Sequence, residues 1–341
     1  MKASGPSIGL LAAALLAALC MPLAASGSGE KTTGKRLAIA YIRPTADLYY
    51  ASGFDGARMA AVKMNVDLQG SLSDLKADQE LADVQGAISH GVDGIILFPV
   101  SALSLSASVG AAYAAKVPVV TLYGYSADLK DKVAGSVQAD LRLCSATLGK
   151  WVAQNISDGQ VTCIMGLPGR GDAEMYRDAF RAEAEKNTHL KLVASAPGDW
   201  NRQKAYSQMQ SLIASYPGMK AVFVENDDMA LGALKALTEA GKADKVAVLS
   251  QNGAPYGLES VAAGGIRITV GWSPSQEAQI ALRLLAALVR DGRAPPKLTL
   301  SPITVISKDT IGTAVPWEAT AASTDATLNM DLSKLQRDFA K

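Results

Sequence analysis

Hydrophobic and polar positions along the chain follow two alternating patterns. Short apolar runs rich in β-branched residues, such as 94–98 and 221–224, are typical of buried parallel strands. Between such runs lie amphipathic stretches, for example one in which Leu81, Val84 and Ile88 share a helix face. Strands that alternate with helices of about 10–15 residues predict βαβ units and a parallel sheet. The expected strands are 37–42, 66–68, 94–98, 118–122, 161–165, 190–195, 221–224 and 246–249.

This strand-and-helix pattern occurs twice. The first series ends near 133–137, and the second begins with a predicted helix at 141–156. The chain length of 341 residues suits two domains of about 130 residues each. Right-handed crossovers place the loops that follow the strands at one sheet edge, where open α/β sheets bind ligands. The sequence therefore predicts an α/β protein with two doubly wound parallel-sheet lobes.

The segment 221–234 places polar residues between a predicted strand and a predicted helix. Four apolar residues precede Asn226, Asp227 and Asp228, and strong helix formers follow from Met229 onward. Asn and Asp are favoured helix caps, and this sheet edge is also where ligands bind. Both roles stay open for Asn226 and Asp227. As a carboxylate pair, Asp227 and Asp228 are better interpreted as a cap with a partner for the helix dipole than as an acid–base pair.

The same segment resembles the Asn-Asp-x-x-Ala-x-Gly-Ala block of the type I periplasmic solute-binding proteins, the ribose- and galactose-binding group. Further matching pieces are 93–99, 117–122 and 197–202, so the resemblance extends over about 35–317. It implies two lobes, joined by a three-segment hinge, that close around a bound ligand.

The resemblance also implies a division of the chain. The hinge crossings would lie near Gln138, Trp272 and Leu300. Residues 318–341 would form a C-terminal extension with a weak helix at 332–339, and the sequence suggests no role for it. The N-terminal lobe would comprise 36–138 plus 273–300, and the C-terminal lobe 139–272 plus 301–317.

Within such a fold the ligand site would lie between the lobes. In the family, the Asn that corresponds to Asn226 contacts the bound sugar. Aromatic rings contact the apolar faces of a sugar and polar groups contact its hydroxyls. The positions that the resemblance assigns to ligand binding are Tyr49, Tyr50, Phe98, Tyr123, Gln138, Tyr176, Trp200, Asn226, Asn252 and Trp272.

Several of these positions depart from the family pattern. Tyr123 and Gly124 replace an Asp-Arg pair, Asn252 replaces an Asp, and Trp272 replaces a Gln. The departures predict an aromatic-rich cleft for a small neutral sugar or sugar-like molecule. The alternative ligand is a non-sugar aromatic, heterocyclic or cationic molecule held by cation–π contacts. A further alternative is that some of these rings belong to the core.

The resemblance implies the substrate-binding component of an ABC importer, with a permease in the inner membrane as its partner. A chemoreceptor or a sensor kinase is an alternative partner for a ligand-sensing protein. No enzymatic activity and no cofactor are expected, because Walker, Gly-x-Ser-x-Gly and His-Glu-x-x-His motifs are absent. The glycine-rich segment 166–171 lacks the Lys-Ser/Thr of a phosphate loop and is interpreted as a turn over the cleft.

Composition excludes other classes. With 33 basic and 32 acidic residues the net charge is +1, so no bias towards nucleic acid or anionic lipid exists. Sugar-responsive repressors need an N-terminal helix-turn-helix, and here a signal segment occupies that place. With His90 and His189 as the two histidines and no Cys-x-x-Cys pair, we expect no zinc site.

The N-terminus predicts export to the periplasm. Lys2 precedes the apolar run 8–20, and small residues follow at 24–27, as in a signal peptide of about 26 residues. The run is too short to span a membrane comfortably. Lipid anchoring at Cys20 is less favoured, because Leu19 stands where a lipobox prefers a small residue. A disulfide between Cys144 and Cys163 and a pair of buried free thiols both stay open.

Overall fold

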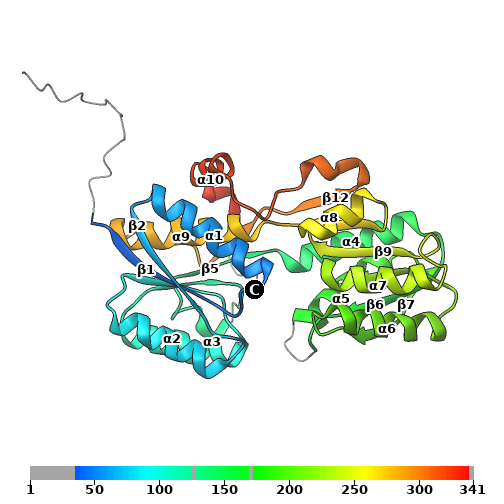
Figure 1. The fold of residues 1–341 in the computed structure, drawn as a ribbon, viewed down its shortest axis with the longest axis horizontal. Helices are drawn as coiled ribbons and strands as arrows, with labels where there is room; N and C mark the ends of the chain where they lie inside the picture. The colour runs from blue at the N-terminus through cyan, green and yellow to red at the C-terminus, as the bar shows by residue number, and fades with distance from the viewer. Residues whose placement is uncertain (1–34, 125–126, 169–171, 338–341) are drawn as a thin grey trace, which may run out of the picture. The chain divides into compact units, whose positions relative to one another are not determined.

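The computed structural model describes residues 35–124, 127–168 and 172–337 (Figure 1). The described residues form two sheets. The first contains seven strands in the order β13-β11-β5-β4-β3-β1-β2, all parallel to their neighbours except β13. Its strands are β1 (Leu37–Arg43), β2 (Val66–Leu72), β3 (Gly94–Leu97), β4 (Val119–Leu122), β5 (Gly135–Ala139), β11 (Leu298–Ser301) and β13 (Gln336–Arg337).

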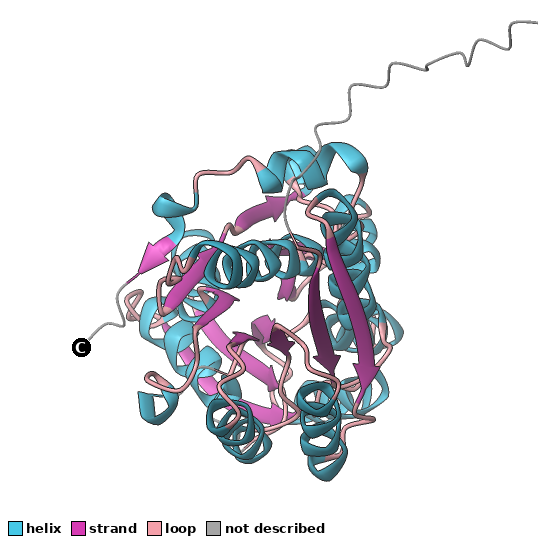
Figure 2. Cartoon of the chain, turned by 90° about the vertical axis from the view of Figure 1, so that its left-hand side faces the viewer, coloured by secondary structure: helices cyan, strands magenta, loops and turns pink. Residues whose placement is uncertain are grey.

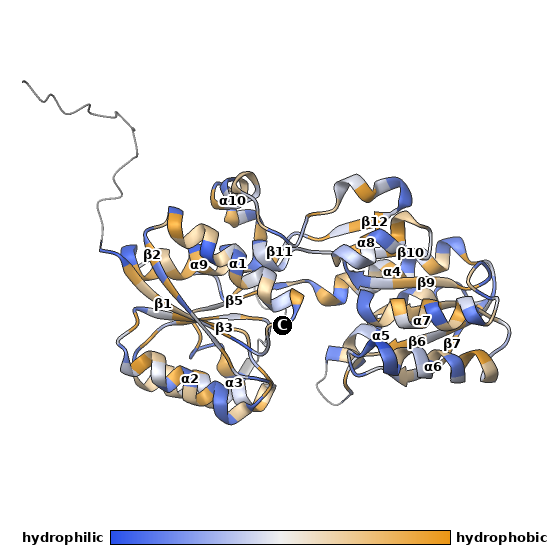
Figure 3. Ribbon diagram, in the orientation of Figure 1, coloured by the Kyte–Doolittle hydropathy of each residue, from blue (hydrophilic) through white to orange (hydrophobic). Residues whose placement is uncertain are grey.

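Helices cover both faces of this sheet (Figure 2). Alternation along β1 explains the two layers: Ile39 and Tyr41 pack in one core with α1 and α9, whereas Ala40 and Ile42 pack in another with α2 and α3. A strand buried on both faces needs apolar residues throughout, as the hydropathy colouring shows (Figure 3). The helices are α1 (Leu48–Lys63), α2 (Ala77–Ser89), α3 (Ala102–Ala114) and α9 (Pro274–Asp291), and a short 3-10 turn η1 spans Ala127–Leu129.

The second sheet has six described strands in the order β12-β10-β9-β8-β6-β7, with β12 antiparallel to β10. Helices α4 and α5 share one core with Cys163, and α6 and α7 share the opposite core with Ile164. The strands are β6 (Gly159–Met165), β7 (Leu190–Pro197), β8 (Met219–Val224), β9 (Ala247–Asn252), β10 (Ile266–Gly271) and β12 (Thr304–Ser307). The helices are α4 (Leu141–Asn155), α5 (Asp172–Ala184), α6 (Arg202–Ser215), α7 (Asp227–Glu239), α8 (Pro255–Ala262) and the 3-10 helix η2 (Lys308–Thr313).

The two sheets share one topology. The order β2-β1-β3-β4-β5 in the first corresponds to β7-β6-β8-β9-β10 in the second. In each case the strand order reverses between the first and third strands of the series, and open α/β sheets bind ligands outside the carboxyl ends of the strands at such a switch point. This confirms the predicted α/β class with two doubly wound lobes. It also places the functional interest on the loops after β1, β3, β6 and β8.

The C-terminal segment returns to the first lobe. Helix α10 (Ala321–Leu328) packs on α9 and α1, and β13 pairs with the edge strand β11. The Gln279 side chain donates to Thr324 Oγ1 at 3.0 Å, and Arg283 donates to the Thr327 carbonyl at 2.6 Å. The weak helix predicted at 332–339 is wrong over its described part, which is a 3-10 turn η3 (Leu332–Leu335) followed by β13. The segment beyond 317 thus adds a fourth crossing between the lobes.

Other predictions concern thiols and the N-terminus. Cys144 and Cys163 are both free thiols buried in the second lobe, so the disulfide alternative is not realised. The predicted signal peptide and Cys20 lie outside the described residues. Within the described ranges, no helix is both long and apolar enough to cross a membrane.

Candidate ligand site

The predicted ligand-binding residues lie at or just after the carboxyl ends of strands, or in the first two turns of the following helix. From the first sheet, Phe98 follows β3, Tyr123 follows β4, and Gln138 is half-buried near the end of β5. From the second sheet, Asn252 ends β9 and Trp272 follows β10. The remaining members, at the starts of helices, are Tyr49 and Tyr50 in α1, Tyr176 in α5, Trp200 before α6 and Asn226 before α7.

Five aromatic side chains form a continuous cluster, which we call the aromatic wall: Tyr49, Tyr50, Phe98, Tyr123 and Trp317. Tyr50 meets Phe98 edge-on with ring centroids 4.7 Å apart, and Phe98 stacks on Tyr123 at 5.4 Å. Tyr49 contacts Trp317 edge-on at 5.1 Å. Edge-on and offset-stacked rings are the favoured aromatic geometries. Trp317 was not among the predicted site residues, because it lies at the end of the recognisable pattern.

A buried carboxyl group lies behind this wall. Glu277, in the first turn of α9, accepts hydrogen bonds from the hydroxyls of Tyr123 and Ser301 at 2.8 Å each, and from Tyr49 at 3.1 Å. Trp272 Nε1 donates to the Tyr49 hydroxyl at 3.0 Å. The polar atoms of Tyr49, Tyr123 and Trp272 therefore already have partners. Tyr49 and Tyr123 are half-buried, whereas Trp272 is 3% exposed and belongs to the hydrophobic core of the second lobe, as the alternative of core rings predicted.

Sequence reasoning missed Glu277. The signal was an acidic residue on the apolar face of an amphipathic helix, where an unpaired charge is rare. Burial raises the pKa of Glu277 from 4.5 to about 7, although the hydroxyl donors oppose the shift.

In the second lobe, Tyr176 and Trp200 meet edge-on with centroids 6.4 Å apart. The Trp200 ring lies directly over Gly166, where a Cβ atom would stand 1.9 Å from the ring. Only glycine permits this approach, which supports the interpretation of a glycine turn. Residues 169–171 of that turn lie outside the described ranges.

The buried carboxyl of Glu225 anchors the same turn. Glu225 directly follows β8 and is 1% exposed, and its Oε2 accepts the backbone N–H of Gly166 at 2.6 Å. Burial raises the pKa of Glu225 from 4.5 to about 9, so the group is neutral near pH 7. Glu225 therefore ties the loop after β6 to the end of β8, at the switch point of the second sheet.

The structure shows the capping role of Asn226, and its ligand role stays a prediction. Its Oδ1 accepts the backbone N–H of Met229 at 2.8 Å, which makes Asn226 the N-cap of α7. The side chain is half-buried, and among the described residues its amide nitrogen has no hydrogen-bond partner. The oxygen caps the helix and leaves the N–H₂ donor available to a ligand.

The neighbouring residues Asp227 and Asp228 have different structural roles. Asp227 is buried and accepts hydrogen bonds from Ser250 Oγ, from Thr269 Oγ1 at 2.9 Å and from the Ala254 N–H at 2.7 Å. It therefore links α7 to β9 and β10, so its interpretation as a simple cap was wrong. Asp228 pairs with Arg202 at 2.6 Å near the surface, also a different role from acid–base chemistry.

Asn252 ends β9 in the left-handed region of backbone conformation, with φ of 113°. Its carbonyl accepts the indole N–H of Trp317 at 3.1 Å and the backbone N–H of Trp272 at 3.2 Å. These bonds join the end of β9 to the second and fourth crossings. They leave the half-buried Asn252 side chain at the edge where Asn226 also lies.

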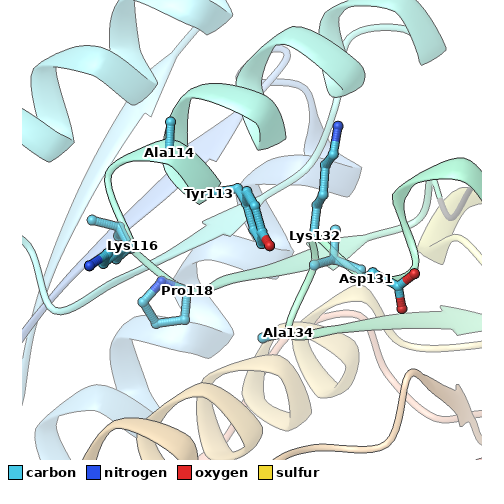
Figure 4. Close-up of a pocket in the computed structure, with 9 residues that line it drawn as sticks. Tyr113, Ala114, Lys116, Pro118, Asp131, Lys132 and Ala134 are labelled. Carbon is cyan, nitrogen blue, oxygen red and sulfur yellow. The ribbon is translucent and has the colours of Figure 1, made fainter.

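A pocket of about 590 Å³ lies elsewhere on the first lobe (Figure 4). Its lining includes Tyr113 at the end of α3, and Lys116, Pro118, Asp131 and Lys132 from the loops that precede β4 and β5. These are the amino ends of the strands, the edge opposite to the aromatic wall, and no predicted ligand-binding residue lines the pocket. In the part of the chain that the structure describes, no group of three or more His, Cys, Asp or Glu side chains is placed to hold a metal ion.

Comparisons with known proteins agree with the fold. The sequence profile described as periplasmic binding protein domain matches residues 39–294. The ribose import binding protein of Salmonella typhimurium is 32% identical over 229 residues, which are 67% of this chain and 76% of that protein. The xylitol-binding protein of Mycolicibacterium smegmatis is 28% identical over 316 residues, 90% of this chain and 87% of its own length.

Among solved structures, a periplasmic solute-binding protein from Actinobacillus succinogenes with bound D-allose superposes with a TM-score of 0.77. It is 23% identical and covers 82% of this chain and all of its own length, so it supports the fold. The profile match and the ribose-binding relative establish the family: this chain belongs to the type I periplasmic binding proteins, in the group that includes the ribose-binding proteins.

Proposed function

We propose that this protein is the substrate-binding component of an ABC importer and binds a small neutral sugar or polyol at the aromatic wall. The family is a non-enzymatic transport component, and related proteins carry names for ribose import, xylitol binding and D-allose binding. An ABC permease in the inner membrane is the expected partner, and a chemoreceptor is an alternative one. We further propose that the predicted signal peptide directs export to the periplasm. A soluble periplasmic protein is favoured over one that is lipid-anchored at Cys20.

The proposal of a neutral ligand rests on the positions of the charged side chains near the predicted site. Three carboxyl groups next to the predicted site residues, Glu225, Asp227 and Glu277, are each about 1% exposed and bonded to protein donors. Arg202 is paired with Asp228 and Arg177 with Asp178. Among the predicted site residues, what remains for a ligand is ring faces and the amides of Gln138, Asn226 and Asn252. Rings suit the C–H faces of a sugar and amides suit its hydroxyls.

A thermal-shift screen tests this proposal. The panel contains D-ribose, D-allose, xylitol and myo-inositol on one side, and aromatic, heterocyclic and quaternary-amine compounds on the other. A ligand at about 100 times its dissociation constant adds about 2.7 kcal/mol to the folded state, which raises the melting temperature by several degrees. We expect such a shift from at least one sugar or polyol. A shift confined to the aromatic or cationic compounds would replace the proposed ligand class by the alternative.

Asn226→Asp separates the ligand role of Asn226 from its capping role. Aspartate retains the oxygen that accepts the Met229 N–H and is as good a cap, but it lacks the amide donor. We expect the affinity for the sugar identified in the screen to fall about tenfold or more, the scale of a buried hydrogen bond lost. The apo melting temperature should stay within about a degree or two of the wild type. Isothermal titration and thermal melting measure the two quantities.

The matched control is Asn201→Asp. Asn201 caps α6 through the same kind of bond, to the Lys204 N–H at 2.9 Å, and is exposed. This variant should leave affinity and stability unchanged. Unaltered affinity in Asn226→Asp would restrict Asn226 to capping.

A further inference from the structure

The sequence predicted three crossings between the lobes. Hydrogen bonds connect the Glu277 carboxyl to the chain at each of these crossings. Tyr123, which donates to Glu277, also accepts the backbone N–H of Ala139 at 3.3 Å, where β5 leads into the second lobe. Tyr49, which donates to the other carboxyl oxygen, accepts from Trp272, where β10 leads back. Ser301, the third donor, ends β11 at the next crossing.

The electrostatic surroundings of this carboxyl are unusual. The titratable groups that face it are Tyr41 on β1, Tyr49 on α1, Tyr123 after β4 and Cys144 on α4. Each of these is neutral near pH 7, and burial raises the pKa of each one. Among the described residues no cation compensates Glu277, so three hydroxyl donors and the backbone N–H of Ala139 hold it. A buried carboxyl held this way is costly to disturb, because any lost donor leaves a polar group unsatisfied.

We propose that Glu277 is a positioning residue for ligand binding: its carboxyl holds the Tyr49 and Tyr123 rings in the aromatic wall and ties them to the chain segments that cross between the lobes. Glu277 is 1% exposed and lies behind the rings, so it acts through them and not by touching the ligand. The inference rests on the proposed function, because it assigns the wall to ligand binding.

Protonation of Glu277 then influences affinity. A ligand seated on Tyr49 and Tyr123 excludes water from the network behind them, which disfavours the charged carboxylate further. Ligand binding therefore raises the Glu277 pKa above about 7 and takes up protons. By linkage, affinity falls as the pH rises through this range.

The test compares Glu277→Met with Glu277→Gln. Methionine removes the acceptor and leaves the Tyr49 and Tyr123 hydroxyls without it. Glutamine keeps an oxygen for Tyr123 and Ser301 and presents N–H donors to Tyr49, as a protonated glutamate does. The control is Glu80→Met: Glu80 is equally buried and accepts from Ser104, Ser108 and the Val100 N–H, none of which belongs to the wall or to the crossings.

Affinities for D-ribose, D-allose and xylitol are measured by calorimetry at about pH 6 and about pH 8.5, on either side of the Glu277 pKa of about 7. We expect Glu277→Met to weaken binding at least about tenfold, and Glu277→Gln to stay within about threefold of the wild type at the lower pH. The wild type should bind a few-fold more tightly at the lower pH, and Glu277→Gln should lose this dependence. Equal affinity of Glu277→Met and the wild type, or equal weakening by Glu80→Met, would overturn the proposal.

Amide hydrogen exchange of the ligand-free protein supplies an independent readout. In Glu277→Met the amide of Ala139 should exchange faster, whereas in Glu80→Met it should not. Unchanged exchange would refute the link to the crossings, whatever the ligand. If none of the sugars binds the wild type but Ala139 exchanges faster in Glu277→Met, the proposed ligand class fails while the positioning of the tyrosines stands.

Discussion

Asp227→Ala should lower the free energy of unfolding by at least about 3 kcal/mol, because it leaves three buried hydrogen-bond donors without an acceptor. Ser250 Oγ and Thr269 Oγ1 share one carboxylate oxygen, and the Ala254 N–H bonds to the other. Each unsatisfied buried donor costs about 1–3 kcal/mol, and alanine also leaves space beside Gly257, which packs against the carboxyl group. Urea unfolding of the ligand-free protein measures the loss.

Asp228→Ala is the control, since the neighbouring carboxylate is paired with Arg202 at the surface. An exposed ion pair contributes about 0–1 kcal/mol, so this variant should unfold close to the wild type. Similar losses in both variants would contradict the role of Asp227 as the link between α7 and the strands β9 and β10. A loss confined to Asp227→Ala would support it.

The stability of the ligand-free protein should fall as the pH rises from about 8 to about 9, and Glu225 should contribute the largest single share of that fall. The folded-state pKa of Glu225 is about 9 and the ordinary value is 4.5, so between these values the folded chain binds a proton that the unfolded chain has lost. The stabilisation is complete below pH 4.5 and disappears as the pH rises through about 9. The slope is at most about 1.4 kcal/mol per pH unit.

Asp227 and Glu277 contribute with the same sign at lower pH, because burial raises their pKa values to about 6 and about 7. Comparison near pH 8–9 separates Glu225 from these two groups, whereas the buried thiols of Cys144 and Cys163, whose pKa values burial also raises, contribute there with the same sign. Glu225→Gln should remove the largest share of the slope in this range, whereas Glu259→Gln, at an exposed position, should retain it. Denaturant unfolding at several pH values measures both. A wild-type slope that persists in Glu225→Gln would mean that another group is responsible.

Local sequence patterns predicted some elements of the fold, whereas others depend on tertiary packing. The strand at 221–224 and the polar residues after it were predictable, because a buried parallel strand needs a continuous apolar run and a helix start needs a cap. Strands β5, β10, β11, β12 and β13 were not among the predicted strands. The pairing of β5 with β11 joins segments that are far apart in the sequence, and no local pattern records which neighbour a strand meets.

For the aromatic residues, too, the sequence predicted the positions but not the contacts. Tyr49, Tyr123 and Trp272 were recognised as candidates by position, but their shared dependence on Glu277 was not, since a helix residue about 150 positions away has no local relation to Tyr123. Trp317 joins the wall only because the chain beyond η2 folds back over α1 and α9.

By itself, the sequence determined the α/β class, the two series of strands and helices, the family and the strand ends that carry the candidate site, because these follow from local periodicity, helix starts and short motifs. Only the tertiary structure decided which polar atoms remain free for a ligand. Glu225, Asp227 and Glu277 look like available charges along the chain, yet each is buried and bonded to donors from distant segments. The reason is physical: burial and hydrogen-bond satisfaction depend on what lies nearby in space, and neighbours in sequence do not specify it.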